Sequence, residues 1–279
     1  MAGTGLFLRL RLTTTRKFRN NLLFNNKNPE SFLSGFFIYF CNMIGVYDSG
    51  EGGKSVLKEL LKLMPWEDYV YYGDKAYCPY GPKSPGFIIG RACAITDFLI
   101  AKGCDIIVVA CNTATAAAIS YLRGHYQIPF VGMEPAIKPA VLHSKSGVVG
   151  VLATAGTFKG RLYLNTLARF SGNVKVIERI GEGLVETVEK GILDGPEVEK
   201  LVRKCINPML KAGADHIVLG CTHYPFLQPV IERIAGPGVT VVNPAPAVAA
   251  QTLRVLSGIK KTEPSDKEGS VEFCYSSKD

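Results

Sequence analysis

Short β-branched, apolar runs alternate with longer helical stretches from residue 44 to the end of the chain. This alternation predicts an α/β fold in which mainly parallel sheets are flanked by helices on both faces. Ligands bind at the carboxyl ends of the strands in such folds, so candidate chemistry is sought there. The predicted strands span residues 44–47, 69–72, 106–110, 130–132, 147–152, 175–179, 216–219, 239–242 and 271–275. The predicted helices span residues 53–63, 86–101, 114–126, 136–142, 159–170, 184–190, 196–211, 225–234 and 245–256.

The chain contains an internal repeat. The segments GCDIIVVACNTA and GADHIVLGCTHY match at a constant offset of 110 residues, so that Cys111 corresponds to Cys221. A second pair, IGVYDSG and VGVLATAG, matches at an offset of 105 residues and aligns Gly45–Val46 with Gly150–Val151. Buried strands share Val, Ile and Gly in any protein, but a cysteine at the same strand end in both copies favours a real duplication. The sequence therefore predicts two pseudo-symmetric α/β domains.

Composition excludes several classes of protein. Hydrophobic residues make up 47% of the 279 residues and charged residues 20%, which is typical of a globular protein rather than a disordered or fibrous one. No apolar run reaches the ~18 residues that a membrane-spanning helix needs, so a soluble protein without membrane contact is expected. The net charge of +8 is concentrated in residues 1–42, which hold six basic residues and one acidic residue. The remainder carries only +3 and shows no basic stripe, so nucleic acid is not an expected partner.

Two further features bear on location. The Arg-rich segment 1–42 resembles an organellar transit peptide. We favour the alternative that translation begins at Met43 and that residues 1–42 are a disordered or artefactual extension. The eight cysteines form no CxxC pair, which gives no metal site and indicates reduced thiols in the cytoplasm.

The repeated cysteines suggest a reaction. If the two halves face each other across a cleft, Cys111 and Cys221 lie on opposite walls of it. One thiolate can then remove a proton from a tetrahedral carbon while the other thiol delivers a proton to the opposite face, which inverts the centre. The usual thiol pKa of ~8.5 allows thiolate to form near neutral pH at modest cost. No flavin or pyridoxal site is recognisable, so no cofactor is expected.

Polar neighbours of the cysteines fit this chemistry. Asp48 and Ser49 open the turn DSGEGG, where a carboxylate can orient a thiol and exposed N–H groups can bind carboxylates. A helix predicted to begin directly after Cys111 favours its thiolate. His223 follows Cys221 by two residues and is the expected base or acid of that half. Taken singly, DSGEGG reads as a capped helix start and a lone histidine as structural, but all these groups stand at predicted strand ends.

Four segments, DSGEGG, YYGDKAYCPYG, VACNTA and LGCTHYP, resemble the signature segments of the glutamate racemases of the aspartate/glutamate racemase family. The resemblance extends from about Met43 to the end of the chain. It implies an isomerase that interconverts L-glutamate and D-glutamate without a cofactor and supplies D-glutamate for peptidoglycan, and hence for cell wall biogenesis and cell shape. It also implies two domains with the active site in the cleft between them. The first domain comprises residues 43–134 plus 243–279, and the second comprises residues 135–242. The oligomeric state stays open, with a homodimer as one outcome.

The resemblance also implies roles for individual residues. Cys111 and Cys221 are the two acid–base residues, Asp48 assists Cys111, and His223 and Glu189 assist Cys221. The expected substrate contacts are Asp48, Ser49, Tyr80, Gly81, Asn112, Thr113, Thr222 and His223.

Three segments depart from the family pattern. Lys75 and Tyr77 replace a Thr and an Arg in GDKAYCPYG, GEGLVETVE precedes Lys190 where CPxxVPLVE is commoner, and NPAPAVAAQ replaces a more acidic stretch. These changes remove no expected catalytic group, but they bear on side-chain specificity and subunit contacts.

Three alternatives stay open. An aspartate or broad-specificity racemase uses the same scaffold, although such relatives resemble GCTE where this chain has GCTH. A catalytically silent binding protein would retain the fold without proton exchange. A Cys–His hydrolase using Cys221 and His223 would leave Cys111 unexplained.

Overall fold

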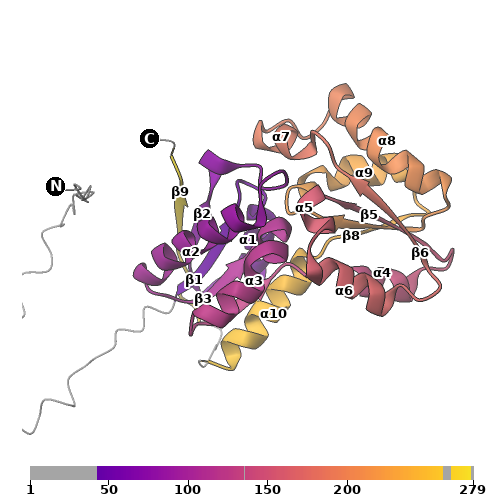
Figure 1. Ribbon diagram of the computed structural model, residues 1–279. Helices are drawn as coiled ribbons and strands as arrows, with labels where there is room; N and C mark the ends of the chain where they lie inside the picture. The colour runs from indigo at the N-terminus through magenta and orange to yellow at the C-terminus, as the bar shows by residue number, and fades with distance from the viewer. Residues whose placement is uncertain (1–42, 135, 260–264, 278–279) are drawn as a thin grey trace, which may run out of the picture. The chain divides into compact units, whose positions relative to one another are not determined.

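The computed structural model describes residues 43–134, 136–259 and 265–277, so the expectations for segment 1–42 lie outside the described residues. The described chain forms two parallel sheets flanked by helices (Figure 1), which confirms the predicted fold class. The first sheet has the order β4-β3-β1-β2-β9, and the second the order β6-β5-β7-β8. The strands are β1 (Met43–Asp48), β2 (Asp68–Gly73), β3 (Cys104–Val109), β4 (Phe130–Gly132), β5 (Val148–Ala153), β6 (Lys175–Ile180), β7 (His216–Gly220), β8 (Thr240–Val242) and β9 (Val271–Tyr275).

All nine predicted strands and all nine predicted helices have counterparts in the structure, most of them with shifted ends. The α-helices are α1 (Lys54–Leu63), α2 (Pro85–Ala101), α3 (Asn112–His125), α4 (Ile137–His143), α5 (Ala155–Phe158), α6 (Arg161–Phe170), α7 (Leu184–Glu189), α8 (Pro196–Lys211), α9 (Gln228–Ala235) and α10 (Ala245–Ser257). The 3-10 helices are η2 (Lys75–Tyr77) and η3 (Tyr224–Leu227).

Strand pairing supports the internal repeat. The orders β4-β3-β1-β2 and β8-β7-β5-β6 are equivalent, with β9 added at the edge of the first sheet. Gly45 of β1 pairs with Ile107 of β3, and Gly150 of β5 pairs with Ile217 of β7. These are the residues that the two sequence offsets align, so both halves share one topology and one register.

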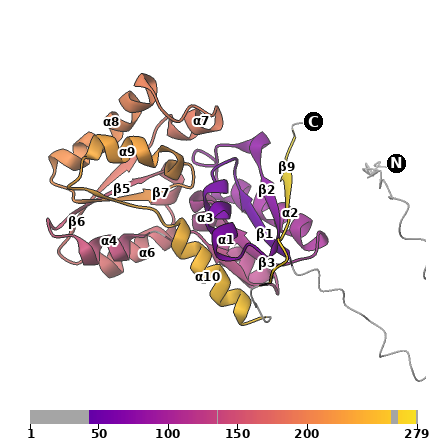
Figure 2. The same cartoon turned by 180° about the vertical axis from the view of Figure 1, so that it is seen from behind.

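Each sheet is covered on both faces. In the first sheet, α1 and α10 pack on one face through Leu60 and Val248, while α2 and α3 cover the other. Figure 2 shows α10 beside α1, although the two helices are far apart in sequence. In the second sheet, α8 and α9 cover one face, and α4 and α6 the other. The apolar faces of these helices and both faces of the strands thus form continuous cores.

Two predicted helices differ from the observed ones. The helix expected over 159–170 begins at Arg161 and is preceded by the separate α5, whose first turn is capped by the Thr154 hydroxyl. The helix expected over 225–234 divides into η3 and α9, because Pro229 at the start of α9 has no N–H to continue the preceding turn.

The C-terminal segment returns to the first sheet. Strand β9 pairs with β2, and α10 packs against α1. The domain bounds 43–134 plus 243–279 and 135–242 stay a prediction.

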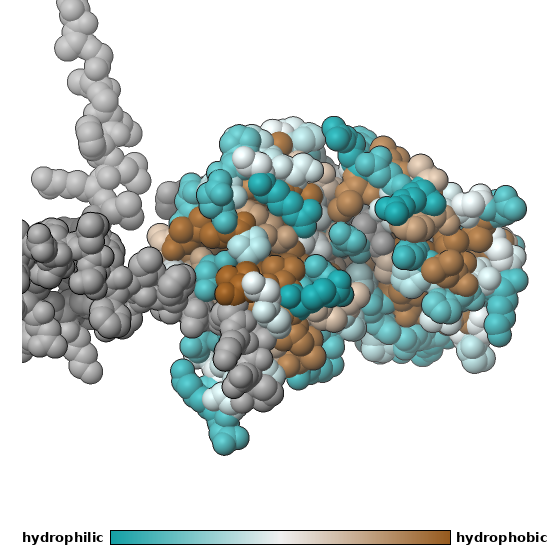
Figure 3. Space-filling view, turned by 90° about the horizontal axis from the view of Figure 1, so that it is seen from below, coloured by the Kyte–Doolittle hydropathy of each residue, from teal (hydrophilic) through white to brown (hydrophobic). Residues whose placement is uncertain are grey.

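None of the helices in the described part of the chain is long and apolar enough to cross a bilayer. Hydrophilic side chains separate the hydrophobic patches on the face seen in Figure 3.

Candidate active site

The polar residues expected at the strand ends do meet. Strand β1 ends at Asp48, Cys221 directly follows β7, and Cys111 lies two residues after the end of β3. Both thiols line one cavity of about 10 Å³. Its lining residues are Ser49, Pro79, Tyr80, Gly81, Cys111, Asn112, Thr113, Thr154, Val185, Cys221, Thr222 and His223. The cavity therefore collects the predicted residues except Asp48 and Glu189, which bond to its lining residues Thr222 and His223.

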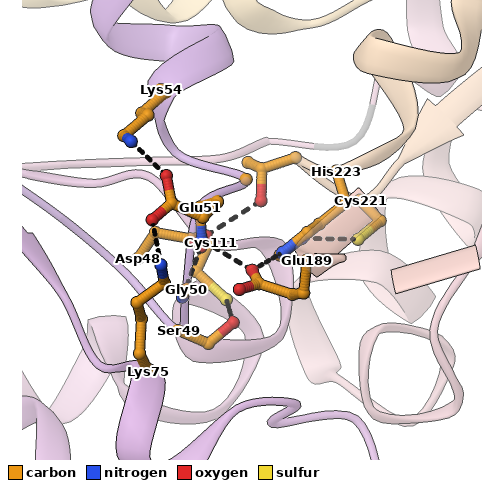
Figure 4. Close-up of polar contacts among 12 residues, drawn as sticks. Asp48, Ser49, Gly50, Glu51, Lys54, Lys75, Cys111, Glu189, Cys221 and His223 are labelled. Atoms are coloured by element: carbon orange, nitrogen blue, oxygen red, sulfur yellow. Dashed lines mark hydrogen bonds and ion pairs between the residues drawn. The ribbon is translucent and has the colours of Figure 1, made fainter. Parts of the chain in front are cut away.

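Cys111 is held at the start of α3. Its thiol donates to Ser49 Oγ over 3.8 Å (Figure 4). Its sulfur accepts from the Ala114 N–H at 3.4 Å. Burial and the neighbouring Asp48 carboxylate raise the pKa of Cys111 well above its usual value, and the Ala114 N–H does not offset them. The helix start does act to lower the pKa of Cys111, as expected, but burial and the Asp48 charge outweigh it. Cys111 is a neutral thiol here.

Asp48 is fully buried and joins the two halves. Its carboxylate accepts from the Gly50 N–H at 2.7 Å and from the Thr222 hydroxyl at 2.9 Å. Burial raises its pKa despite these bonds and the nearby His223. A buried carboxylate of raised pKa beside a thiol is suited to accept a proton.

Cys221 faces a histidine that is paired with a carboxylate. The sulfur lies 3.7 Å from His223 Nδ1, and His223 Nε2 lies 2.6 Å from Glu189 Oε1 (Figure 4). Burial acts to lower the pKa of His223, but bonds with Cys221, Cys78 and Glu189 outweigh it and hold the pKa well above 6.5. Burial acts to raise the pKa of Glu189, yet bonds from His223 and from the Glu51 N–H hold it low. The pair is therefore imidazolium and carboxylate.

The turn DSGEGG lies against these groups. A Cβ added to Gly52 would meet His223 Nδ1, and one added to Gly50 would meet Glu189 Oε1, so both positions require glycine. The turn does bind carboxylates through its N–H groups, as expected, but they belong to Asp48 and Glu189 of the chain itself.

Contacts between the halves are reciprocal. The Asp48 carboxylate at the end of β1 bonds Thr222 after β7, while the Thr154 hydroxyl after β5 lies 2.8 Å from that of Thr113 after β3. Thr154 was missed in the sequence, although the offset of 105 residues aligns it with Ser49. The repeat was the signal that could have identified it.

Tyr80 lines the cavity, and its hydroxyl is bonded within the chain. It donates to Asp74 Oδ2 at 2.5 Å, and Asp74 also receives two bonds from Arg91, at 2.7 and 2.9 Å. Arg91 lies 4.3 Å over the ring of Tyr77, the residue that replaces the family arginine. Helix α2 thus supplies an arginine to this loop, and sequence reasoning missed Asp74 and Arg91.

Lys75, the other departure in this loop, pairs with Glu51 at 2.5 Å. Glu51 also pairs with Lys54, and its N–H donates to Glu189 at 2.6 Å. Lys75 is therefore linked to the site indirectly, because its ion-pair partner Glu51 donates its backbone N–H to Glu189.

Two features of the cavity favour a polar, anionic ligand. Both side-chain polar atoms of Asn112 are buried without a hydrogen-bond partner in the described chain. A second cavity of about 550 Å³ shares Gly81 and Thr113 with the first. Its charged lining residues are cationic, namely Lys83, Lys159 and Arg161.

Comparisons with known proteins agree with this geometry. The family model described as Asp/Glu/Hydantoin racemase matches residues 54–252. A glutamate racemase of Herpetosiphon aurantiacus is 47% identical over 233 residues, which cover 84% of this chain and 92% of that protein. The crystal structure of glutamate racemase isoform RacE1 from Bacillus anthracis superposes with a TM-score of 0.77 at 31% identity, over 86% of this chain and 90% of that one. Glutamate racemase from Francisella tularensis, in complex with D-glutamate, gives 0.74 at 28% identity, over 85% and 89%. The chain belongs to the Asp/Glu/hydantoin racemase family.

Proposed function

We propose that this chain is a glutamate racemase, an isomerase that interconverts L-glutamate and D-glutamate by proton transfer between two thiols. The observation that carries the proposal is that Cys111 and Cys221 line the same cavity. Relatives 47% identical over most of their length are glutamate racemases, and the Francisella enzyme was crystallised with D-glutamate. The family role of this activity is to supply D-glutamate for peptidoglycan.

The two thiols work from opposite sides of the α-carbon. One sulfur, as thiolate, takes the α-proton, and the other, as thiol, returns a proton to the opposite face. In the reverse direction the two sulfurs exchange roles. Asp48, whose charge acts on the Cys111 thiol, is the proton partner of Cys111. His223, oriented by Glu189, is the proton partner of Cys221.

The substrate is held by short polar side chains and backbone N–H groups. Asn112 supplies an amide whose donor and acceptor are both unused in the described chain. Ser49, Thr113 and Thr222 line the same cavity and carry hydroxyls. Because about 10 Å³ holds little more than one water molecule, the halves must part to admit glutamate. The cationic side chains of the adjoining cavity suit the approach of a dicarboxylate.

The arrangement of Cys221, His223 and Glu189 also fits a thiol nucleophile with its base and orienting carboxylate. Such a hydrolase would have no use for Cys111 in the same cavity. An aspartate racemase would use both thiols and is distinguished by comparing turnover of glutamate and aspartate enantiomers.

Incubation in deuterated buffer tests the proposal. We expect the wild type to interconvert both enantiomers of glutamate and to place deuterium at the α-position. Cys111→Ser and Cys221→Ser each lose racemisation by about 10²–10⁴-fold, the usual contribution of a positioned acid or base. Cys93→Ser, on α2 and outside the cavity lining, is the matched control and keeps full activity. Deuterium entry that survives unchanged in the double serine variant would exclude the cysteines from the mechanism.

A cytoplasmic location follows from the reduced thiols, and a homodimer is compatible with the family. Both are proposals, tested by fractionation and by sedimentation.

A further inference from the structure

Three potential metal ligands from distant segments meet beside the thiol cavity. Cys78 follows η2, Glu189 ends α7, and His223 follows β7. One ligand atom from each residue lies within 4.8 Å of the other two. Local sequence patterns do not reveal this cluster, because the three residues share no short metal-binding spacing.

The ligand set suits Zn²⁺, which favours thiolate, imidazole and carboxylate in a tetrahedral arrangement. Ligands at bond lengths of about 2.0–2.3 Å lie about 3.4 Å apart around a tetrahedral ion. His223 Nε2 and Glu189 Oε1, now 2.6 Å apart across a shared proton, would separate by less than about 1 Å when the ion replaces that proton. The Cys78 sulfur lies within 4.8 Å of a ligand atom of each partner and would approach by at most about 1.4 Å to reach such a spacing.

The space is closed around these atoms. A Cβ placed on Gly50 would lie 3.0 Å from Cys78 Sγ and would also meet Glu189 Oε1. The turn DSGEGG therefore packs closely against Cys78 and Glu189, and a side chain at position 50 would collide with both. Cys78 does not line the thiol cavity, so it lies outside the substrate site.

We propose that Zn²⁺ binds Cys78, Glu189 and His223 and reversibly inhibits the racemase. The ion binds His223 Nε2, the nitrogen that now bonds Glu189, and holds the imidazole in place. His223 then no longer exchanges a proton with Cys221. The thiol proton of Cys78 and the proton between His223 and Glu189 leave to solvent, and no redox change occurs. The inhibition rests on the proposed function, whereas metal binding itself does not.

Binding is measured first, on the full chain, with Zn²⁺ by calorimetry and with Co²⁺ by its thiolate charge-transfer absorption. We expect one equivalent to bind the wild type and Cys93→Ala, and binding at least about tenfold weaker in Cys78→Ala, since a thiolate ligand is lost. Cys78→Ser keeps the side-chain size and is expected to match Cys78→Ala. Equal binding by the wild type and both Cys78 variants overturns the proposal, whatever the enzymatic activity.

Inhibition is measured next, with glutamate as substrate. Half-inhibition of Cys78→Ala requires at least about ten times more Zn²⁺ than the wild type or Cys93→Ala, and a chelator restores all three. If Zn²⁺ inhibits Cys78→Ala as strongly as the wild type, the ion acts on the catalytic thiols and the proposal is wrong. If Zn²⁺ binds through Cys78 but glutamate is not racemised even without metal, the proposed function fails and the metal site stands.

Discussion

Replacing Glu189 by glutamine removes the charge that faces His223 and keeps the shape of the side chain. Glu189 Oε1 accepts from His223 Nε2 and from the Glu51 N–H, both at 2.6 Å. In the Glu189→Gln variant, the amide oxygen of the new side chain can still accept the backbone bond. What is lost is the carboxylate opposite a buried imidazolium, so the variant isolates the electrostatic role of Glu189.

The size of the effect follows from that one bond. A hydrogen bond between charged groups contributes about 1.5–3 kcal/mol, and each pKa unit corresponds to about 1.4 kcal/mol. The pKa of His223, which is raised in the folded enzyme, therefore falls by about one to two units. A histidine loses its proton as the pH rises through its pKa, so the alkaline side of the kcat/KM profile moves to lower pH by that amount. Above the new pKa, kcat/KM falls about 10–100-fold.

The assay follows both directions of racemisation by circular dichroism, with a chelator present. Enantiomers have equal free energies, so kcat/KM in the two directions must stay equal in every variant and cannot report which thiol is impaired. Primary kinetic isotope effects, measured with α-deuterated substrates, do report which thiol is impaired. We expect the effect to grow for the enantiomer whose α-hydrogen faces Cys221 and to change less for the other.

Glu182→Gln is the matched control, since Glu182 is an exposed residue paired with Lys204. If Glu189→Gln leaves the alkaline limb of the kcat/KM profile unshifted and changes kcat/KM by less than about twofold, Glu189 does not act on Cys221 through His223.

Two further predictions concern stability and substrate approach. Asp74→Ala leaves the buried Tyr80 hydroxyl without its acceptor and the partly buried Arg91 without its carboxylate partner. It is expected to lower the free energy of unfolding, measured with urea, by about 2–4 kcal/mol. Tyr80→Phe removes one bond and costs about 1 kcal/mol, and an equal loss in the two variants would contradict this account. Joint replacement of Lys159 and Arg161 by alanine is expected to lower kcat/KM at low salt and to flatten its dependence on ionic strength. The reason is that the cationic side chains of the adjoining cavity attract a dicarboxylate. An unchanged salt dependence of kcat/KM would exclude that role.

The strands and the thiol pair were predictable from the sequence because their signals are local or repeated. Val, Ile and Gly runs mark buried strands, and the offset of 110 residues aligns Cys111 with Cys221. The pairing of Gly45 with Ile107 and of Gly150 with Ile217 then follows from the same repeat. Glu189 was identified through the family resemblance, and its contact with His223 is a finding of the structure.

What could not be predicted depends on contacts between distant segments. Cys78 belongs to no CxxC pair, so no local pattern marks it as a metal ligand, and only folding brings it to His223. Asp74 and Arg91 are separated by a loop and a helix turn, and no local pattern marks them as partners. The neutral state of Cys111 depends on burial, which outweighs the helix start that the sequence does show.

The matched register of the two sheets bears on how an inverting catalyst can be assembled from L-amino acids. Such a protein cannot make the mirror image of an acid–base group, but a flat carbanion does not require one, since a half-turn carries its upper face onto its lower face. Two copies of one sheet with reciprocal loop contacts are the arrangement expected of such a half-turn. The same rotation would exchange the amino group with the side chain, so the copies have to differ where they hold these groups. Asp48 stands where the second copy has Ala153, and His223 where the first has Thr113.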